Sequence, residues 1–234
     1  MAKKETYKII LSGGGTGGHI YPAIAIANEL QTRYPSAEFL FVCAKDRMEM
    51  EKVPANGYQI IGLPIAGFQR SFTISNILKN LQLPFKVIFS LFKVMQIINK
   101  FQPDIAIGTG GYASAPTLKM AQWIGIPTFI QEQNALPGKT NLYLGNKAKC
   151  AFVSYEESKE YFQNCEVVYT GNAIRESFAE EISDRKSAIE FFNLDPNKKT
   201  IFITGGSLGA RAINEGIVEQ FDKLIAEDFQ IIWH

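Results

Sequence analysis

The segment Ile9–Gly18, which reads IILSGGGTGG, determines the fold class of this chain. Its first residues are apolar and typical of a buried strand, and the glycines form a tight turn into the helical pattern Ala23–Leu30. A buried strand, a glycine-rich turn and a helix make up the first unit of a Rossmann-like domain. Such a turn lets the backbone approach a ligand closely, and the helix N-terminus offers unpaired N–H groups that suit phosphate.

Short, nearly all-apolar strand patterns recur after this segment and alternate with helical patterns. The predicted strands are Tyr7–Ser12, Glu38–Cys43, Tyr58–Ile61, Asp104–Gly108, Thr128–Gln131, Lys149–Val153 and Val167–Thr170. The predicted helices are Pro22–Arg33, Pro84–Phe101, Ala113–Trp123 and Glu156–Phe162. This alternation predicts an α/β fold with a doubly wound parallel sheet, covered by helices on both faces, over residues 5–165.

A second strand–turn–helix pattern begins near residue 200. Ile201–Ala210 reads IFITGGSLGA and leads into the helical pattern Ala212–Phe221. This internal repeat predicts two related Rossmann-like domains in tandem. We place the boundary near 170–180, which gives domains 1–170 and 171–234. Because about 60 residues cannot close a doubly wound sheet, we expect only the start of the second domain here, in a piece of a longer chain.

Composition excludes several classes of protein. The 234 residues include 24 basic and 23 acidic ones, and a net charge of +1 argues against a bulk-basic nucleic-acid binder. Cys43, Cys150 and Cys165 are scattered and form no C-x-x-C motif, so neither a disulfide framework nor a zinc site is expected. The N-terminus has no signal-peptide pattern, and no stretch of about 18 uncharged apolar residues predicts a membrane span. The sequence is typical of a cytosolic protein.

The first glycine turn also matches a dinucleotide-binding fingerprint. Gly13, Gly15 and Gly18 satisfy G-x-G-x-x-G, so a nucleotide-dependent oxidoreductase is an alternative interpretation. That fingerprint also needs an acidic residue at the end of the second strand. Here the strand ends at Ala44 and Asp46 comes late, which weakens this alternative. Neither glycine turn continues into the Gly-Lys-Ser/Thr of a Walker A motif.

His19 follows the first glycine turn and is one of two histidines in the sequence. A lone histidine at such a place is often a capping or core residue. The neighbouring glycines, however, offer it little side chain to pack against, and ligands bind at strand–helix turns of open α/β sheets. A helix N-terminus also favours the neutral imidazole, which can act as a base. We therefore predict that His19 is a catalytic base.

Two more predicted strands end in polar or glycine-rich loops. Gly108–Pro116 joins a buried strand to a helix, and Gln131–Asn134 follows another strand directly. Each loop alone is explained by turn and cap chemistry. Three such loops at the carboxyl edge of one parallel sheet favour a ligand-binding cleft.

A basic apolar segment separates the second and third of these loops from the first. Residues 52–103 contain six basic residues and no acidic one. Lys79, Lys86, Lys93 and Lys100 recur at intervals of seven, which places them on one stripe of a helix. One interpretation is a core helix with a solvated lysine stripe. The other is peripheral attachment to an anionic membrane surface, either by an enzyme or by a non-catalytic lipid-binding module. The residues expected at that surface are Lys79, Phe85, Lys86, Phe89, Phe92 and Lys93.

Five ordered motifs resemble the MurG family of bacterial glycosyltransferases. They are Gly14–Pro22, Gly110–Pro116, Glu132–Asn134, Gly171–Arg175 and Gly205–Arg211. The resemblance implies a GT-B architecture and an inverting transfer of N-acetylglucosamine from UDP-GlcNAc to the C4 hydroxyl of the MurNAc unit of lipid I, which gives lipid II. It also implies peripheral attachment at the cytoplasmic face of the inner membrane, and no cofactor or metal ion.

The resemblance implies roles for individual residues as well. His19 is the expected base. The residues expected to contact UDP-GlcNAc are Thr16, Gly17, Gly18, Asn134, Arg175 and Ser207. The residues expected to bind the acceptor are Gly110, Gly111, Tyr112, Ser114 and Glu132. Since most of the second domain is missing, we expect the 234-residue chain alone to be inactive.

Overall fold

The computed structural model describes residues 6–68, 71, 73–174, 184–205 and 209–234. The chain divides into two compact units, Met1–Glu176 and Ser177–His234, and each is described by itself. The sequence-based boundary, between 170 and 171, lies in the same stretch of chain as this division.

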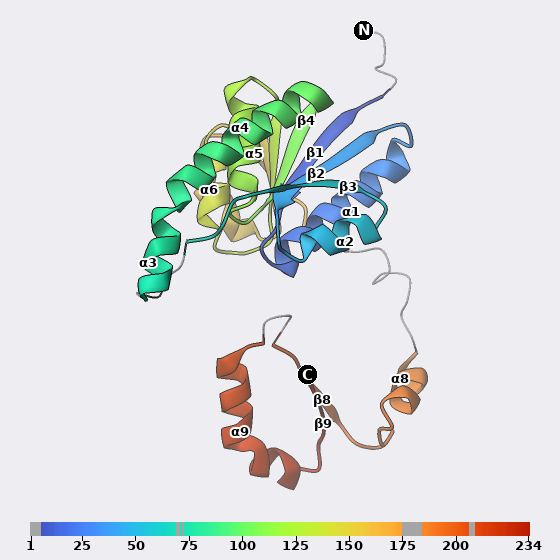
Figure 1. The fold of residues 1–234 in the computed structure, drawn as a ribbon. Coiled ribbons are helices and arrows are strands. Elements are labelled where there is room, and N and C mark those ends of the chain that lie inside the picture. Colours follow the sequence, from blue (N-terminus) through green and yellow to red (C-terminus); the bar gives the residue numbers. More distant parts are fainter. Residues whose placement is uncertain (1–5, 69–70, 72, 175–183, 206–208) are drawn as a thin grey trace. The chain divides into compact units, whose positions relative to one another are not determined.

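The first unit is built on a seven-stranded, fully parallel sheet with the strand order β3-β2-β1-β4-β5-β6-β7 (Figure 1). The strands are β1 (Lys8–Gly13), β2 (Glu38–Ala44), β3 (Gln59–Leu63), β4 (Ile105–Gly110), β5 (Thr128–Glu132), β6 (Cys150–Val153) and β7 (Glu166–Tyr169). All seven strands predicted from the sequence are present, with bounds that differ by no more than two residues. The Rossmann-like fold class is thereby confirmed.

Helices cover both faces of this sheet. They are α1 (Gly17–Arg33), α2 (Glu49–Ala55), α3 (Ile74–Leu81), α4 (Leu83–Phe101), α5 (Ser114–Trp123), α6 (Lys139–Gly145) and the 3-10 helix η1 (Glu156–Tyr161). Alternate residues of β1 point to opposite faces. Ile10 packs with Val94 of α4 and Met120 of α5, whereas Leu11 packs with Ile24 of α1. The central strand is therefore buried on both sides, as its apolar sequence predicts.

Helix α1 begins earlier than the sequence suggested. We expected it to start at Pro22, but it begins at Gly17, so His19 lies within its first turn. The amides of His19 and Ile20 bond the Thr16 carbonyl at 3.2 and 3.3 Å, which closes that turn. Pro22, the sixth residue of this helix, has no N–H and therefore removes one helical hydrogen bond.

The sequence prediction also missed α2, α3 and α6. Helices α2 and α6 have seven residues each, too few for a clear helical period. The expected lysine stripe is divided, because the helix breaks at Gln82 between α3 and α4. Lys79 lies on α3, whereas Lys86, Lys93 and Lys100 lie on α4. Pro84 occupies the first turn of α4, as its fixed backbone geometry predicts.

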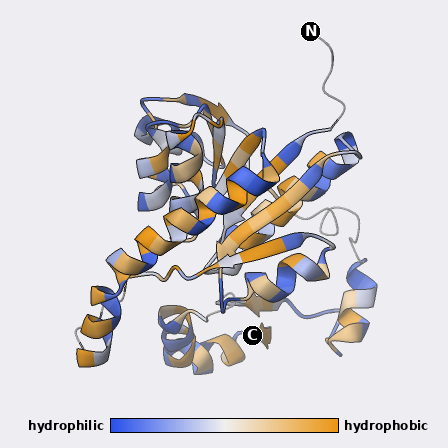
Figure 2. Cartoon of the chain, turned by 45° about the horizontal axis from the view of Figure 1, so that its top comes forward, coloured by the Kyte–Doolittle hydropathy of each residue, from blue (hydrophilic) through white to orange (hydrophobic). Residues whose placement is uncertain are grey.

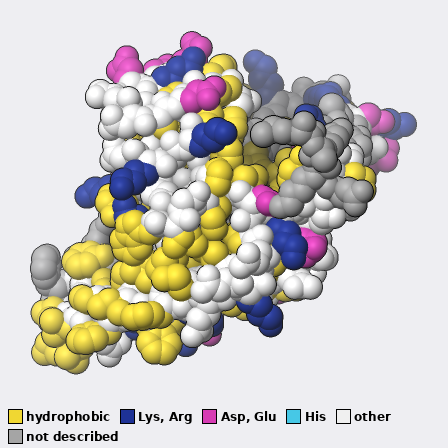
Figure 3. All heavy atoms as spheres, turned by 90° about the horizontal axis from the view of Figure 1, so that it is seen from above, with side chains coloured by type: hydrophobic (Ala, Val, Ile, Leu, Met, Phe, Trp, Pro, Cys, Tyr) yellow, Lys and Arg dark blue, Asp and Glu magenta, His cyan; other side chains and the backbone are white. Residues whose placement is uncertain are grey.

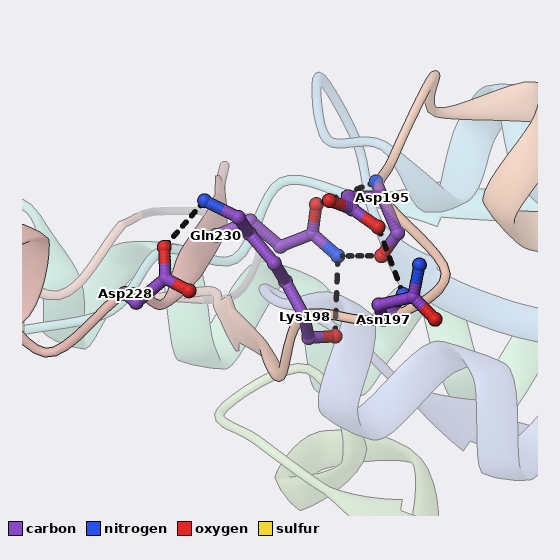
Figure 4. Close-up of polar contacts among 5 residues, drawn as sticks. All are labelled: Asp195, Asn197, Lys198, Asp228 and Gln230. Atoms are coloured by element: carbon purple, nitrogen blue, oxygen red, sulfur yellow. Dashed lines mark hydrogen bonds and ion pairs between the residues drawn. The ribbon is translucent and has the colours of Figure 1, made fainter.

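The second unit contains the beginning of another Rossmann-like domain. Its strands β8 (Thr200–Ile203) and β9 (Gln230–Trp233) pair in parallel and are joined by α9 (Arg211–Ala226), while α8 (Arg185–Phe191) precedes them. Gln230 ties β9 to the loop before β8 (Figure 4). Its side chain accepts from the Asp195 amide at 2.8 Å and donates to Thr200 Oγ1 at 2.9 Å, and Lys198 pairs with Asp228 beside it.

The thiol of Cys43 provides a test of the packing beneath the first glycine turn. Burial raises the pKa of Cys43 from 9.0 to about 12. This difference lowers the thiolate fraction roughly 1,000-fold near pH 8. In a Cys150→Ser/Cys165→Ser variant, we expect a thiol reagent to label Cys43 at least about 100-fold more slowly in native protein than in denaturant.

A control variant that keeps only the half-buried Cys165 should be labelled faster in the native state. Similar labelling rates for native and denatured Cys43 would contradict the burial.

The raised pKa of Cys43 also predicts an effect of pH on the stability of the fold. The pKa of Cys43 is raised in the folded state, so stability is lost as the pH rises from about 9 to about 12, where the unfolded thiol ionises first.

Candidate active site

The topology creates a crevice at the carboxyl ends of β1 and β4. These strands pair side by side, yet the chain leaves β1 towards β2 and leaves β4 towards β5, in opposite directions along the sheet. Loops that diverge in this way leave a crevice, which is where open α/β sheets bind ligands. The loop after β1 leads into the first turn of α1, which carries His19, and β4 ends at Gly110 with Gly111 directly after it.

His19 joins these two loops. Its Nδ1 lies 3.0 Å from the carbonyl oxygen of Thr109, and Thr109 Oγ1 donates to the His19 carbonyl at 2.7 Å. A carbonyl can only accept, so Nδ1 carries the proton of the neutral ring and Nε2 keeps a free lone pair. The side chain is only half-buried. This arrangement suits a general base.

Two glycines of the second loop make the close contact with His19 possible. Gly110 and Gly111 have φ values of +97° and +77°, which L-residues rarely adopt. A Cβ atom on Gly110 would lie 3.1 Å from the imidazole ring, and one on Gly111 would lie 2.2 Å from the carbonyl oxygen of Gly14. Only glycine lets the two loops approach this closely.

Buried polar side chains support the first glycine turn. The carboxylate of Glu49, at the start of α2, is fully buried and accepts from the Gly15 amide at 3.1 Å. The ring of Tyr112 lies against Gly15 from the other loop. Sequence reasoning missed Glu49, because nothing in its local pattern indicates that α2 directs it at a turn more than 30 residues earlier.

Glu132 organises the third loop. Its carboxylate is 1% exposed and accepts four hydrogen bonds. Oε1 accepts from the amide and the side chain of Asn134 at 3.0 and 2.9 Å, and Oε2 accepts from the Gly138 amide and from Asn141 Nδ2 at 3.0 and 2.9 Å. With both oxygens occupied, Glu132 lies beneath the loop, not on the surface where we expected it to line an acceptor site. Asn134, in contrast, is exposed.

The remaining predicted site residues differ in accessibility. Thr16 precedes α1 without capping it through its side chain, and Gly18 is exposed while Gly17 is buried. Ser114 is fully buried, and its hydroxyl donates to the Gly111 carbonyl at 2.9 Å, so it shapes the loop from within. Arg175 and Ser207 lie outside the described residues.

Several buried polar atoms beside the glycine loops have no hydrogen-bond partner among the described residues. They are Glu49 Oε2, Tyr112 Oη and Asn141 Oδ1. Buried polar groups are normally satisfied, so their gathering around the two loops is unusual. Within the described part of the chain, no three His, Cys, Asp or Glu side chains are close enough to hold a metal ion.

An exposed apolar surface lies at some distance in sequence from these loops, on α3 and the first half of α4 (Figure 2). The most exposed of its members are Ile74, Ile77, Leu78, Leu81, Phe85, Ile88, Phe89 and Phe92. Figure 3 shows hydrophobic side chains gathered over this part of the first unit. Of the predicted membrane residues, Lys79 is exposed and Lys86 half-buried, whereas Lys93 donates to the Gly62 carbonyl at 2.7 Å and so also serves the fold.

The segment Ile74–Phe101 is long and apolar enough to cross a membrane by length and composition alone, although its lysines leave no uncharged stretch of 18 residues. Its second half is nevertheless part of the protein core, because Val94, Ile97 and Ile98 of α4 are buried against the sheet. The segment therefore has an exposed half and a half that packs on the sheet.

The sequence matches the model of the glycosyltransferase family 28 N-terminal domain over residues 9–153. Among curated proteins, it is 53% identical over 229 residues to the UDP-N-acetylglucosamine–N-acetylmuramyl-(pentapeptide) pyrophosphoryl-undecaprenol N-acetylglucosamine transferase of Flavobacterium psychrophilum, covering 98% of this chain and 61% of that protein. It is 52% identical over 230 residues to the protein of the same name from Christiangramia forsetii, covering 98% and 62%. The chain thus spans less than two thirds of these relatives.

Among solved structures, the chain is similar to Acinetobacter baumannii MurG, with a TM-score of 0.68 and 24% identity over 97% of this chain and 68% of that one. It is also similar to Staphylococcus aureus MnaA in complex with UDP, with a TM-score of 0.62 and 13% identity over 98% and 62% of the two chains. At these identities the similarity establishes the fold, which is that of GT-B glycosyltransferases.

The contact between the two glycine loops can be tested with Gly111→Ala. The new methyl group would overlap the Gly14 carbonyl, and alanine would be held at φ +77°. We expect the free energy of unfolding to fall by at least about 2 kcal/mol, measured by urea denaturation.

Gly125→Ala is the matched control, because Gly125 has φ +82° but no atom within 4 Å of the added Cβ. It should cost only the backbone term, about 1 kcal/mol. Equal losses in the two variants would show that the loops do not press on each other at Gly111.

Proposed function

The chain belongs to glycosyltransferase family 28, and from this premise we propose that the protein transfers N-acetylglucosamine from UDP-GlcNAc to lipid I, giving lipid II for peptidoglycan synthesis. The names of its relatives, which specify this donor and a pyrophosphoryl-undecaprenol acceptor, support the proposal. The observation that carries it is the half-buried His19 at the sheet's switch point, whose Nδ1 bonds the Thr109 carbonyl and so leaves Nε2 of the neutral ring able to accept a proton. Since the chain spans 61% of such a relative, the activity is proposed for the longer protein.

The proposed reaction is a single displacement. Nε2 of His19 takes the proton of the MurNAc C4 hydroxyl while that oxygen attacks the anomeric carbon of GlcNAc. The bond between that carbon and the UDP oxygen breaks with its electron pair on UDP, and the anomeric configuration inverts. The proposed mechanism includes no metal ion or cofactor, as the family resemblance implies.

The second glycine loop is proposed to hold the pyrophosphate of the acceptor. Helix α5 begins at Ser114, whose amide bonds the Gly111 carbonyl at 3.3 Å, and the next amides of its first turn have no earlier helical carbonyl to bond. Tyr112 and the loop that Glu132 organises complete the acceptor side. The first loop is less suited to a phosphate, because Glu49 already occupies the Gly15 amide and a carboxylate disfavours a second anion.

The donor is proposed to contact Thr16, Gly17, Gly18 and Asn134, and the exposure of Gly18 and Asn134 supports that assignment. Arg175 and Ser207 are proposed to bind the diphosphate, a role that suits a guanidinium and a hydroxyl beside a glycine turn.

We further propose that the protein attaches peripherally to the cytoplasmic face of the inner membrane. The exposed apolar side chains of α3 and the first half of α4, with Lys79 and Lys86 among them, support this. Apolar side chains dip into the acyl boundary and lysines pair with anionic head groups, each lysine adding about 1 kcal/mol.

His19→Asn tests the assignment of the base in the full-length protein. Asn Nδ2 can take the place of His19 Nδ1 and donate to the Thr109 carbonyl, so the loop contact remains and only the basic nitrogen is lost. We expect kcat for transfer to a lipid I analogue to fall roughly 100-fold or more. The free energy of unfolding should stay within about 0.5 kcal/mol of the wild type. An unchanged kcat would remove His19 from the mechanism.

Phe89→Ser tests the membrane surface by co-sedimentation with vesicles of phosphatidylglycerol and phosphatidylcholine. Phe89 is 69% exposed, and losing it should weaken binding roughly tenfold. Phe191→Ser, at an 82% exposed phenylalanine of α8, is the matched control and should bind like the wild type. Binding to pure phosphatidylcholine should be weaker. Equal effects of the two substitutions would argue against this surface.

A further inference from the structure

Gln133, at the end of β5, reaches the imidazole of His19 from the third loop. Its Oε1 lies 3.2 Å from His19 Nδ1, on the same edge of the ring as the Thr109 carbonyl. The mechanism above assigns no role to this side chain, although it contacts the proposed base directly.

The orientation of the Gln133 carboxamide is fixed by its surroundings. Its Nε2 shares its two hydrogens among three acceptors, which are the carbonyl of Thr109 at 2.8 Å, the carbonyl of Gln131 at 3.2 Å and Gln131 Oε1. All three partners are acceptors, so the reversed amide would set its oxygen against three oxygens. Oε1 must therefore face His19, which requires a proton on Nδ1.

A chain of buried hydrogen bonds holds Gln133 from behind. Gln131 is 3% exposed, and its Nε2 donates to Ser154 Oγ at 3.3 Å. Ser154 Oγ in turn donates to the carbonyl of Gly171 at 3.3 Å. Each donor along this chain points away from His19, and the chain ends on a carbonyl that can only accept. The Gly171 carbonyl, which can only accept, therefore fixes the donor-to-acceptor direction of every hydrogen bond in this chain.

We propose that Gln133 is a positioning residue for His19. Its carboxamide oxygen holds the Nδ1 proton, so that Nε2 is the basic nitrogen of the neutral ring, and stabilises the imidazolium that forms when Nε2 takes a proton. The catalytic consequence rests on the proposed function, whereas the tautomer and the charge effect do not. Two carboxylates reach the neighbouring loops, Glu49 from α2 and Glu132 from β5, and both bond loop amides, not the imidazole.

The test is nitrogen NMR of histidine-labelled full-length protein, with the His19 signals identified by their absence in His19→Asn. In the wild type we expect the neutral ring to carry its proton on Nδ1. Gln133→Met keeps the length of the side chain but removes the acceptor. It should move the midpoint of the His19 titration to lower pH by about half a unit or more, because the imidazolium loses a partner.

The same variant should lower kcat about tenfold while the KM values for both substrates stay within twofold. The acidic limb of the pH profile should move in the same direction as the titration, which a merely structural role would not produce. Gln163→Met, the same change at an exposed glutamine, is the matched control and should leave the His19 signals and the kinetics unchanged.

An Nε2-protonated His19 in the wild type would overturn the proposal, even if Gln133→Met failed to fold. So would a titration midpoint that Gln133→Met leaves within about 0.2 pH units of the wild type. If the NMR results are as expected but the protein transfers no GlcNAc, the proposed function fails and the positioning role of Gln133 stands.

Discussion

The close approach of two strand-end loops is the constraint on which the site depends. The carbonyl of Thr109 accepts from His19 Nδ1, and the hydroxyl of Thr109 returns a bond to the His19 carbonyl. This reciprocal pair needs β1 and β4 to be neighbours in the sheet and needs Gly111 to pass within contact of Gly14. A side chain larger than hydrogen at Gly111 would separate the loops and with them the imidazole from its acceptor.

Buried side chains then hold each of the three loops in a fixed shape through hydrogen bonds to the loop backbone. Glu49 braces the first turn and Glu132 the third, each through backbone amides that would otherwise be free to bind an anion. Among the residues that the structure describes, no carboxylate bonds the second loop in this way. The hydroxyl of Ser114 holds it instead, by donating to the Gly111 carbonyl. The three glycine-rich or polar loops are therefore chemically different, and the second is the one left suited to a pyrophosphate.

Features that depend on a local sequence pattern, such as the strands, could be predicted from the sequence. Contacts that depend on the order of the strands in the sheet could not. Apolar runs located all seven strands of the first unit, and the isolated His19 after a glycine turn led to the proposed base. The hydrogen bond of Glu49 to the Gly15 amide and that of Gln133 to His19 join residues 34 and 114 positions apart. The pairing of β1 with β2 places Glu49 near the first turn, and the pairings of β1 with β4 and of β4 with β5 bring Gln133 to His19. Gln133 lies within a polar run of the sequence, but from the sequence alone its neighbours Glu132 and Asn134 were equally good candidates for contact with a ligand or with His19. Burial, which the sequence does not reveal, separates their roles.

Helix α4 illustrates the same limit on a larger scale. Its sequence is apolar on nearly every side, so periodicity alone cannot separate a core helix from a membrane-binding one. In the structure the two halves of the helix differ, because Val94, Ile97 and Ile98 pack on the sheet while Phe85 and Phe89 remain exposed. Lys93 stands at the transition and bonds the Gly62 carbonyl of β3. Because the packed half anchors the helix to the same sheet that positions His19, a membrane bound through the exposed half would hold the catalytic loops at a fixed distance from the lipid surface.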